Sequence, residues 1–309
     1  MTTRTAMIMG MTTIMVIRIH TATPIPTRMG TPIPMGIPTG IRMTEGACPL
    51  PNPPPLREGG DLDKDRHPLP RSGGGSGWGP VSAAHLTKLL AWLSPSFPVG
   101  GFSYSHGIEA AVEQGLVRDR DTLARWMDGI LRHGAGRTDG MLFVAAHRAV
   151  RTGDEAGFAW AVERADAMRA SSETALESRA QGQAFLIAVR AAWPLEGMER
   201  WDRVIADSGR PVAYAVAVAL AAALIGVPEG PALSAYLHAF AANLVSAGVR
   251  LVPLGQTDGQ KALAALDSVV HSAAEAALAA PLDDLGSRAM AVDWTSMIHE
   301  TQYTRLFRS

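Results

Sequence analysis

The 309-residue chain has a single cysteine, no excess of basic or acidic residues, and few long hydrophobic runs. Its one cysteine, Cys48, excludes an internal disulfide and fits a reducing compartment such as the cytoplasm. The 28 Lys and Arg nearly balance the 29 Asp and Glu, and no basic run marks a nucleic-acid-binding face. The strongly apolar run 212–225 has only fourteen residues, whereas a bilayer-spanning helix needs about 20. We therefore expect a cytoplasmic protein that binds neither nucleic acid nor a membrane.

Sequence motifs of common nucleotide and metal sites are also missing. No G-x-x-x-x-G-K-[ST] sequence predicts a GTP site in this chain. The histidines after residue 80 form no H-x-H, H-E-x-x-H or Cys/His cluster; they are His85, His106, His133, His147, His238, His271 and His299. Because isolated histidines are usually structural, we predict no stable metal site. His299, next to Glu300, is the candidate to test first, since imidazole is a common ligand of transition metals.

Residues 1–80 differ in composition from the rest of the chain. Residues 1–43 contain eight of the fourteen methionines and no acidic residue, and residues 44–80 are rich in Pro and Gly. Arg4 and Arg18 interrupt the first apolar stretch, which does not resemble a secretory signal. Such a composition buries too little apolar surface to offset chain entropy, so we predict a disordered leader over residues 1–80.

From residue 81 to 309, apolar residues recur at helical spacing. One helix face is formed by Leu123, Trp126, Met127, Ile130 and Leu131. Asp119 precedes this set as a candidate cap, and similar patterns lie within 142–149, 176–191 and 263–277. No segment alternates as a strand would. We predict one all-α domain, 81–309, of roughly eight to ten helices, which is long enough to bury a substantial core.

The segment 94–109 is dense in residues with special backbone properties or reactive side chains. Pro98 fixes its own φ, and Gly100 and Gly101 can adopt positive φ. One alternative function is a small all-α hydrolase that uses a Ser/His pair within the segment Ser103–His106. However, adjacent Ser105 and His106 point apart on most backbones, and no G-x-S-x-G motif is present. We favour a rigid linker that shapes a protein-binding surface.

The segment 250–260 is more polar than a connection between two helices requires. Pro253 and Gly255 would suffice to end one helix and start the next, with Gly255 as a left-handed cap. The additional polar residues are Arg250, Gln256, Asp258 and Gln260. Polar loop residues carry function disproportionately, so we predict that these four bind a partner.

The chain closes with an unusual tail for a terminus, which normally frays. It carries Tyr303, Arg305, Leu306 and Phe307. Together with SFPVGGFSYSHG at 96–107, the segment around 171–182 and RLVPLGQTDGQ at 250–260, this tail resembles the UreF family of urease accessory proteins. The resemblance covers about residues 84–309. The signature residues are Pro98, Gly100, Gly101, Tyr104, Ser105, His106, Gly107, Glu109, Ser172, Glu173 and Gly255. Thr174 and Glu177 also fit a helix capping box.

This resemblance implies a non-catalytic chaperone that helps load nickel into urease. Such a protein would form a homodimer, dock with UreD (called UreH in some species) and recruit the GTPase UreG, so that apo-urease receives nickel as GTP is hydrolysed. Nickel would be handled by the complex and GTP bound by UreG, with no cofactor held stably by this chain. We expect the four tail residues, loosely ordered in the isolated chain, to bind UreD, and the 250–260 residues to face UreG. A helical adaptor unrelated to urease is the second alternative.

The resemblance also suggests an origin for residues 1–43. Histidine codons read one base out of frame encode Met, Ile and Thr, which are abundant in this segment. Many urease operons encode a nickel carrier with a His-rich tail. We therefore suspect an off-frame translation of a neighbouring gene, with the true start downstream.

Overall fold

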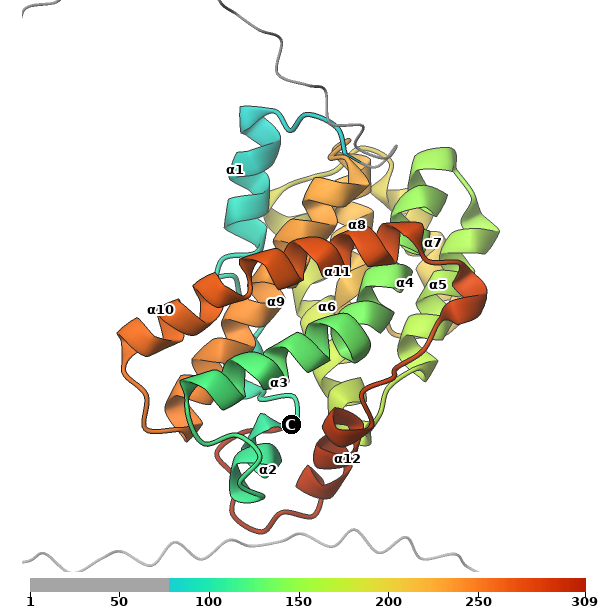
Figure 1. Cartoon of the computed structure of the whole chain (residues 1–309). Coiled ribbons are helices and arrows are strands. Elements are labelled where there is room, and N and C mark those ends of the chain that lie inside the picture. Colours follow the sequence, from blue (N-terminus) through green and yellow to red (C-terminus); the bar gives the residue numbers. More distant parts are fainter. Residues whose placement is uncertain (1–77) are drawn as a thin grey trace, which may run out of the picture. The chain divides into compact units, whose positions relative to one another are not determined.

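A computed structural model describes residues 78–309 of the chain. Within this range the chain forms twelve α-helices, two short 3-10 helices and no strand (Figure 1). The all-α prediction is confirmed. The helices outnumber the expected eight to ten because breaks divide segments that resemble continuous helices in the sequence; for example, only Leu266 separates α10 from α11.

The helices follow one another along the chain with short connections. They are α1 (Ala83–Trp92), α2 (Ile108–Glu113), α3 (Arg120–His133), α4 (Ala135–Thr152), α5 (Glu155–Ala167), α6 (Ser172–Ala192), α7 (Met198–Ser208), α8 (Tyr214–Leu224), α9 (Glu229–Leu251), α10 (Gln256–Ala265), α11 (Asp267–Ala279) and α12 (Met290–His299). The 3-10 helices are η1 (Gly101–Ser103) and η2 (Leu282–Asp284).

The predicted leader, residues 1–80, lies outside the described residues except for its last three. Of these, Trp78 packs against the ring of His271, with 4.9 Å between the ring centroids. The segment that packs on the helical domain therefore includes residues on the leader side of the predicted boundary.

The centre of the helical domain is α8, which packs against α4, α6 and α9 (Figure 1). The nine residues from Ala215 to Ala223 are all buried, and all are Ala, Val or Leu. Small side chains let neighbouring helices approach closely. At the closest approach, a Cβ atom on Gly182 of α6 would lie 2.1 Å from the carbonyl oxygen of Val212, so only glycine fits there.

Of single helices in the described residues, α9 alone is long and apolar enough, by length and composition, to cross a membrane. The bent pair α10 and α11 passes the same test only if the two are taken together. In the structure α9 packs against α3, α4, α8, α10 and α11, and its buried residues include Leu233, Leu237 and Leu244. These contacts are those of a core helix.

Local sequence signals set the starts of α3 and α6. Asp119 caps α3 as predicted, forming a reciprocal capping box with Thr122. On α6, the capping box joins Ser171 and Thr174, so the predicted box between Thr174 and Glu177 is wrong. The helix begins at Ser172, which leaves the buried Glu177 free to bond elsewhere.

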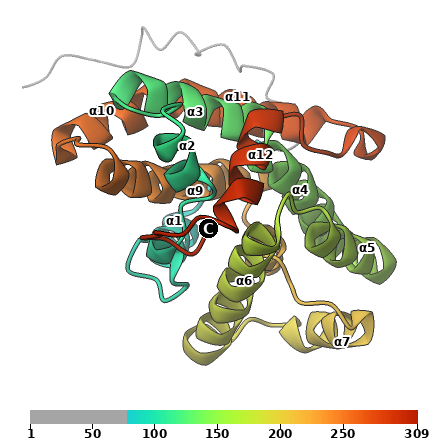
Figure 2. The same ribbon diagram turned by 90° about the horizontal axis from the view of Figure 1, so that it is seen from below.

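The last helix, α12, lies beside α2 and near the start of α6 (Figure 2). Gly107, which precedes α2, has φ +78°, and a Cβ there would lie 2.8 Å from the backbone nitrogen of Ser296. Glycine is therefore required for two reasons, backbone conformation and space. This close approach places the residues that follow α12 over the 101–109 segment.

Candidate functional site

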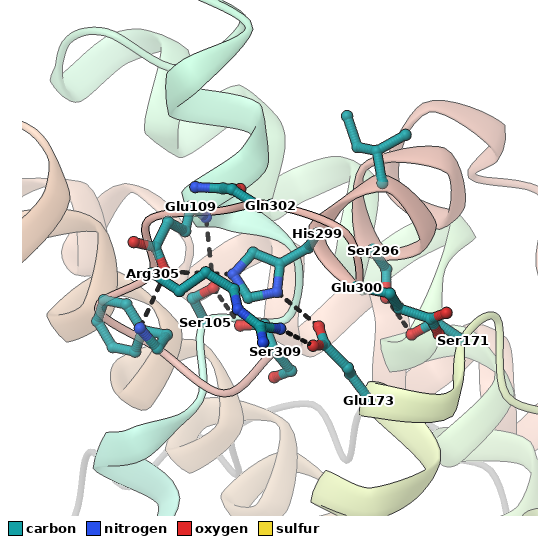
Figure 3. Close-up of polar contacts among 12 residues, drawn as sticks. Ser105, Glu109, Ser171, Glu173, Ser296, His299, Glu300, Gln302, Arg305 and Ser309 are labelled. Atoms are coloured by element: carbon teal, nitrogen blue, oxygen red, sulfur yellow. Dashed lines mark hydrogen bonds and ion pairs between the residues drawn. The ribbon is translucent and has the colours of Figure 1, made fainter.

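The tail, residues 300–309, folds back onto the body of the domain (Figure 3). The backbone nitrogen and hydroxyl of Ser105 both donate to the main-chain oxygen of Ser309, the former at 2.7 Å. The backbone nitrogen of Arg308 donates to the carbonyl of Ser103 at 2.9 Å. Phe307 is buried. This docked arrangement differs from the expectation that the isolated tail is loosely ordered.

Glu109, in the first turn of α2, holds the tail backbone. Its carboxylate accepts hydrogen bonds from the backbone nitrogens of Leu306, at 2.7 Å, and Phe307, at 2.9 Å. The same carboxylate lies 3.2 Å from Nε2 of His299. The side chain is nearly buried, and a buried carboxylate needs such donors to offset the loss of water.

His299, the last residue of α12, lies between two carboxylates and is fully buried. Nε2 faces Glu109, and Nδ1 lies 2.5 Å from the carboxylate of Glu173 on α6. Glu173 also forms an ion pair with Arg305 of the tail (Figure 3). Glu109 faces Nε2 and Glu173 faces Nδ1, so the two carboxylates lie on different sides of the ring. They are not placed to bind one metal ion together with a single ring nitrogen. Among residues 78–309, no three His, Cys, Asp or Glu side chains are placed to hold a metal ion.

His106 anchors the end of the tail from the other side. It is the one described residue other than glycine with positive φ, at 57°. Its Nδ1 lies 3.2 Å from Glu177, which also accepts a hydrogen bond from the Ser309 hydroxyl at 3.0 Å. The Ser105 hydroxyl donates to Ser309, not to His106. These contacts do not form the nucleophile–base pair that a hydrolase requires.

The other signature residues support this arrangement. Gly100 has positive φ as predicted, and the carbonyl of Gly101 accepts a hydrogen bond from Asn243 at 3.0 Å. Tyr104 is buried, whereas Pro98 is exposed. Ser172 donates to Glu300 through its backbone nitrogen and its hydroxyl, and these hydrogen bonds lower the pKa of Glu300.

Arg250, one of the four polar residues of the 250–260 segment, contacts the tail. Its guanidinium donates to the carbonyl of Phe102 at 2.8 Å and lies 4.4 Å from the centre of the Phe307 ring. A cation over an aromatic face is attracted by the ring's negative face. Partial burial lowers the pKa of Arg250.

The other three polar residues of this segment lie in the first turns of α10. Gln256 and Gln260 are exposed, and Asp258 forms an ion pair with Lys261. Gly255 has φ −77° and caps the start of α10 in an extended conformation, so the expectation of a left-handed cap is wrong. Of the four predicted residues, Arg250 thus contacts the tail, and the other three lie at the start of α10.

Large apolar side chains are exposed along the C-terminal segment. On α12 they are Met290, Trp294 and Met297, which share one helix face at spacings of four and three residues. In the tail Tyr303 is fully exposed and Leu306 is 66% exposed. The α12 face was not predicted from the sequence, although its spacing is visible there. Nor was a role in the tail contact predicted for Glu177.

Comparison with known proteins gives one consistent result. A sequence model of the family UreF matches residues 117–267. The urease accessory protein UreF of Bradyrhizobium diazoefficiens is 50% identical over 227 residues, which cover 74% of this chain and 93% of that protein. The same protein of Rhodopseudomonas palustris strain HaA2 is 50% identical over 234 residues, covering 75% and 98%. That of Magnetococcus marinus is 45% identical over 230 residues, covering 73% and 98%. With this identity over nearly the whole length of its relatives, the chain belongs to the UreF family of urease accessory proteins.

Proposed function

We propose that this chain docks with UreD (UreH) and recruits the GTPase UreG, so that nickel is inserted into apo-urease as GTP is hydrolysed. A role in urease maturation follows from family membership, which is incompatible with an adaptor unrelated to urease. In this proposal the chain is a cytoplasmic, non-catalytic chaperone. It acts as a homodimer, the assembled complex handles nickel, and UreG binds GTP.

The proposal is supported by the tail, which packs on the domain with one side and exposes the other side to solvent. Phe307 and Ser309 face the domain, while Tyr303 and Leu306 are exposed. Aromatic residues and Arg dominate binding energy at protein interfaces. Because the docked tail is already ordered, a partner that binds it loses less conformational entropy on association. Arg305, which pairs with Glu173 but is still partly exposed, completes the predicted UreD-binding set.

The start of α10 is the proposed UreG side of the molecule. Gln256, Asp258 and Gln260 supply exposed or partly exposed polar groups on a regular helix. Arg250 has a different role in the proposal, since its donors already bond to the carbonyls of Phe102 and Ser246. We assign it to holding the shape of the tail and η1.

The hydrolase alternative gains no support from the geometry. Ser105 and His106 bond to different groups, Ser309 and Glu177. The relatives are named accessory proteins.

Co-purification of the full chain with UreD tests the tail assignment. The variants Tyr303→Ala and Leu306→Ser should each weaken UreD binding by about thirtyfold, which corresponds to about 2 kcal/mol. Leu282→Ser is the matched control, since Leu282 is also an exposed apolar residue but lies on η2. Both tail variants should keep the wild-type circular dichroism. Unchanged UreD binding by both would refute the assignment.

A second capture experiment tests the α10 surface. Gln256→Lys combined with Gln260→Lys should reduce UreG recruitment by the preformed complex with UreD, without releasing UreD. Gln114→Lys combined with Gln183→Lys, both at exposed positions outside α10, controls for the two added charges. If the double variant recruits UreG as well as the control does, the α10 start is not the UreG side.

A further inference from the structure

A cavity of about 180 Å³ lies between the start of α4, the connection from α5 to α6, and α12. The residues that line it include Ala135 and Thr138 of α4, Arg169 and Ala170 of the connection, and Asp293 of α12. A cavity of about 150 Å³ can hold a benzene-sized molecule. The space between these three elements is therefore large enough for a small ligand.

Arg169 brings an unused hydrogen-bond donor to this cavity. Its side chain is 8% exposed. Nε donates to the carbonyl of Ala165 at 2.9 Å, and Nη1 lies 2.9 Å from Oδ1 of Asp139, in an ion pair that lacks the alignment of a hydrogen bond. Neither Ala165 nor Asp139 lines the cavity, so the donor that remains for the cavity is Nη2. Within residues 78–309 this buried nitrogen has no hydrogen-bond partner, which is a costly state for a buried donor.

The start of α4 adds further donors to the same cavity. This helix of 18 residues has no side-chain cap and no acidic residue in its first turn. The first N–H groups of a helix have no partner within it, and they carry the positive end of the helix dipole. Ala135 and Thr138 of this turn line the cavity. The start of α4 and Arg169 thus both favour an acceptor oxygen in the cavity.

Acceptors line the cavity as well. Asp293 uses one carboxylate oxygen to accept a hydrogen bond from Ser287 at 2.7 Å, and within residues 78–309 its other oxygen accepts none. His106 also lines the cavity, and the tautomer that donates from Nδ1 to Glu177 leaves Nε2 as an acceptor. A ligand that pairs with all of these groups must both accept and donate hydrogen bonds.

Charge decides which class of ligand fits. Arg169 is compensated by Asp139, so Asp293 carries the unbalanced charge among the described residues that line the cavity. An anion would be repelled by this carboxylate, and a cation would meet the guanidinium of Arg169. An uncharged amide suits both, because its oxygen accepts and its nitrogen donates. We propose that the cavity binds a small uncharged molecule with a carboxamide group, whose oxygen accepts from Arg169 and whose nitrogen donates to Asp293.

This site goes beyond the proposed function, because binding needs the chain alone and neither UreD nor UreG. Chemical-shift titration of the isotope-labelled full chain tests it with acetamide, acetate and acetone. These probes have the same number of non-hydrogen atoms, but acetate is charged and acetone has no N–H donor. Acetamide should bind saturably, with the millimolar dissociation constant of so small a ligand. It should shift the Nε–H signal of Arg169 and the backbone amide signals of Thr138 and Thr174, which line the cavity.

Acetate and acetone should bind at least about tenfold more weakly than acetamide. Each leaves a polar group of the site unpaired, and a site built to hydrogen-bond a group discriminates against an analogue that lacks it. Equal binding of the three probes would overturn the proposal, since it would mean that the cavity selects no amide. The absence of a saturable shift with acetamide would also overturn it and leave a cavity filled with ordered water.

Substitutions around the cavity sharpen the test. Removal of Arg169 would leave the buried Asp139 unpaired and destabilise the fold, so Asp293 is the better target. Asp293→Asn, at a partly exposed position, removes the charge that disfavours anions, and acetate should then bind within about threefold of acetamide. Asp283→Asn, at an exposed position of η2 outside the cavity, is the matched control and should keep the preference for acetamide. An unchanged preference in Asp293→Asn would contradict the assigned role of that carboxylate and overturn the proposal.

A cavity-filling variant keeps the test decisive if Asp293→Asn fails to fold. Ala170→Leu adds apolar volume at the cavity wall and should abolish the binding of acetamide. Acetamide binding that persists unchanged in Ala170→Leu would place the ligand elsewhere on the surface and overturn the proposal. Capture of UreD and UreG by the chain does not involve this cavity, so a failure of the amide site is distinguishable from a failure of the proposed function.

Discussion

Two buried regions of this domain are built in opposite ways. The helix α8 buries nine consecutive Ala, Val and Leu residues against its neighbours. The cluster beneath the tail buries Glu109, His299 and Glu177, with hydrogen bonds and ion pairs in place of apolar contacts. The α8 region depends on the size of its side chains, whereas the tail cluster depends on charge and on hydrogen bonds.

This difference assigns the two regions different tasks. Burial of apolar surface stabilises a fold without regard to direction. Buried ion pairs often add little net stability, because the lost hydration of each charge offsets their attraction. Their geometry is nevertheless specific. We therefore infer that apolar packing of the kind seen at α8 stabilises the fold, while the cluster determines where the tail binds.

The largest expected effect tests the close packing of α8. Gly182→Ala would force a Cβ against the backbone of Val212, and we expect a loss of about 3 kcal/mol in the free energy of unfolding. Gly129→Ala, in α3 with no atom within 4 Å of the added Cβ, should instead stabilise by about 0.5–1 kcal/mol. Urea unfolding measures both. Equal effects of the two substitutions would contradict the packing argument.

The next effect separates the two sides of the tail. Phe307→Ala removes a buried ring under Arg250 and should reduce tail docking by about 3 kcal/mol, measured by hydrogen exchange at residues 300–309. Tyr303→Ala, at a fully exposed position, should leave docking unchanged. The unfolding midpoint of the rest of the domain should be the same in both variants. An undocked tail in Tyr303→Ala would show that the exposed side also contributes to docking.

A smaller effect tests the carboxylate that holds the tail backbone. Glu109→Gln keeps the side-chain shape but removes the charge that binds two amides and His299, so we expect docking to weaken by about 2 kcal/mol. Glu113→Gln, on the same helix but exposed, serves as the control. Amide hydrogen exchange of residues 300–309 measures the effect. Equal exchange rates in the two variants would show that Glu109 does not contribute to docking.

The smallest expected effect sharpens the contrast by pH. Burial lowers the pKa of His147 below its usual 6.5, so the folded chain keeps this ring neutral while the unfolded chain takes up a proton. The free energy of unfolding should therefore fall as pH drops below about 6.5, by at most about 1.4 kcal/mol per pH unit. In His147→Gln this acid sensitivity should be smaller. Acid would therefore weaken the folded domain through His147.

Comparison of α3 with the tail shows what the sequence could predict. The cap of α3 was predictable because Asp119 and its partner Thr122 are three residues apart. The buried face of α3 was predictable because its apolar residues recur at helical spacing. The role of Glu109 was not, since its tail partners are 197 and 198 residues away in the chain. The error at α6 was one of register: both capping boxes fit the local sequence, and the contact of Ser171 with Ser296 involves a distant helix.

The sequence also could not show that the polar residues of 250–260 lie in two different environments. Polar composition identified Arg250 and Gln256 as unusual, but it does not show where a side chain points. The side chain of Arg250 turns toward Phe102 and Phe307, while Gln256 begins the next helix. Six residues in sequence thus separate two different environments.

The alternation of Leu306 outward and Phe307 inward couples docking of the tail to binding of a partner. A protein that binds only the docked tail favours the docked state, and docking favours that protein by the same factor. The apparent dissociation constant therefore rises in inverse proportion to the fraction of chains with a docked tail. A buried substitution such as Phe307→Ala should then weaken partner binding even though the exposed contact residue, Leu306, is unchanged.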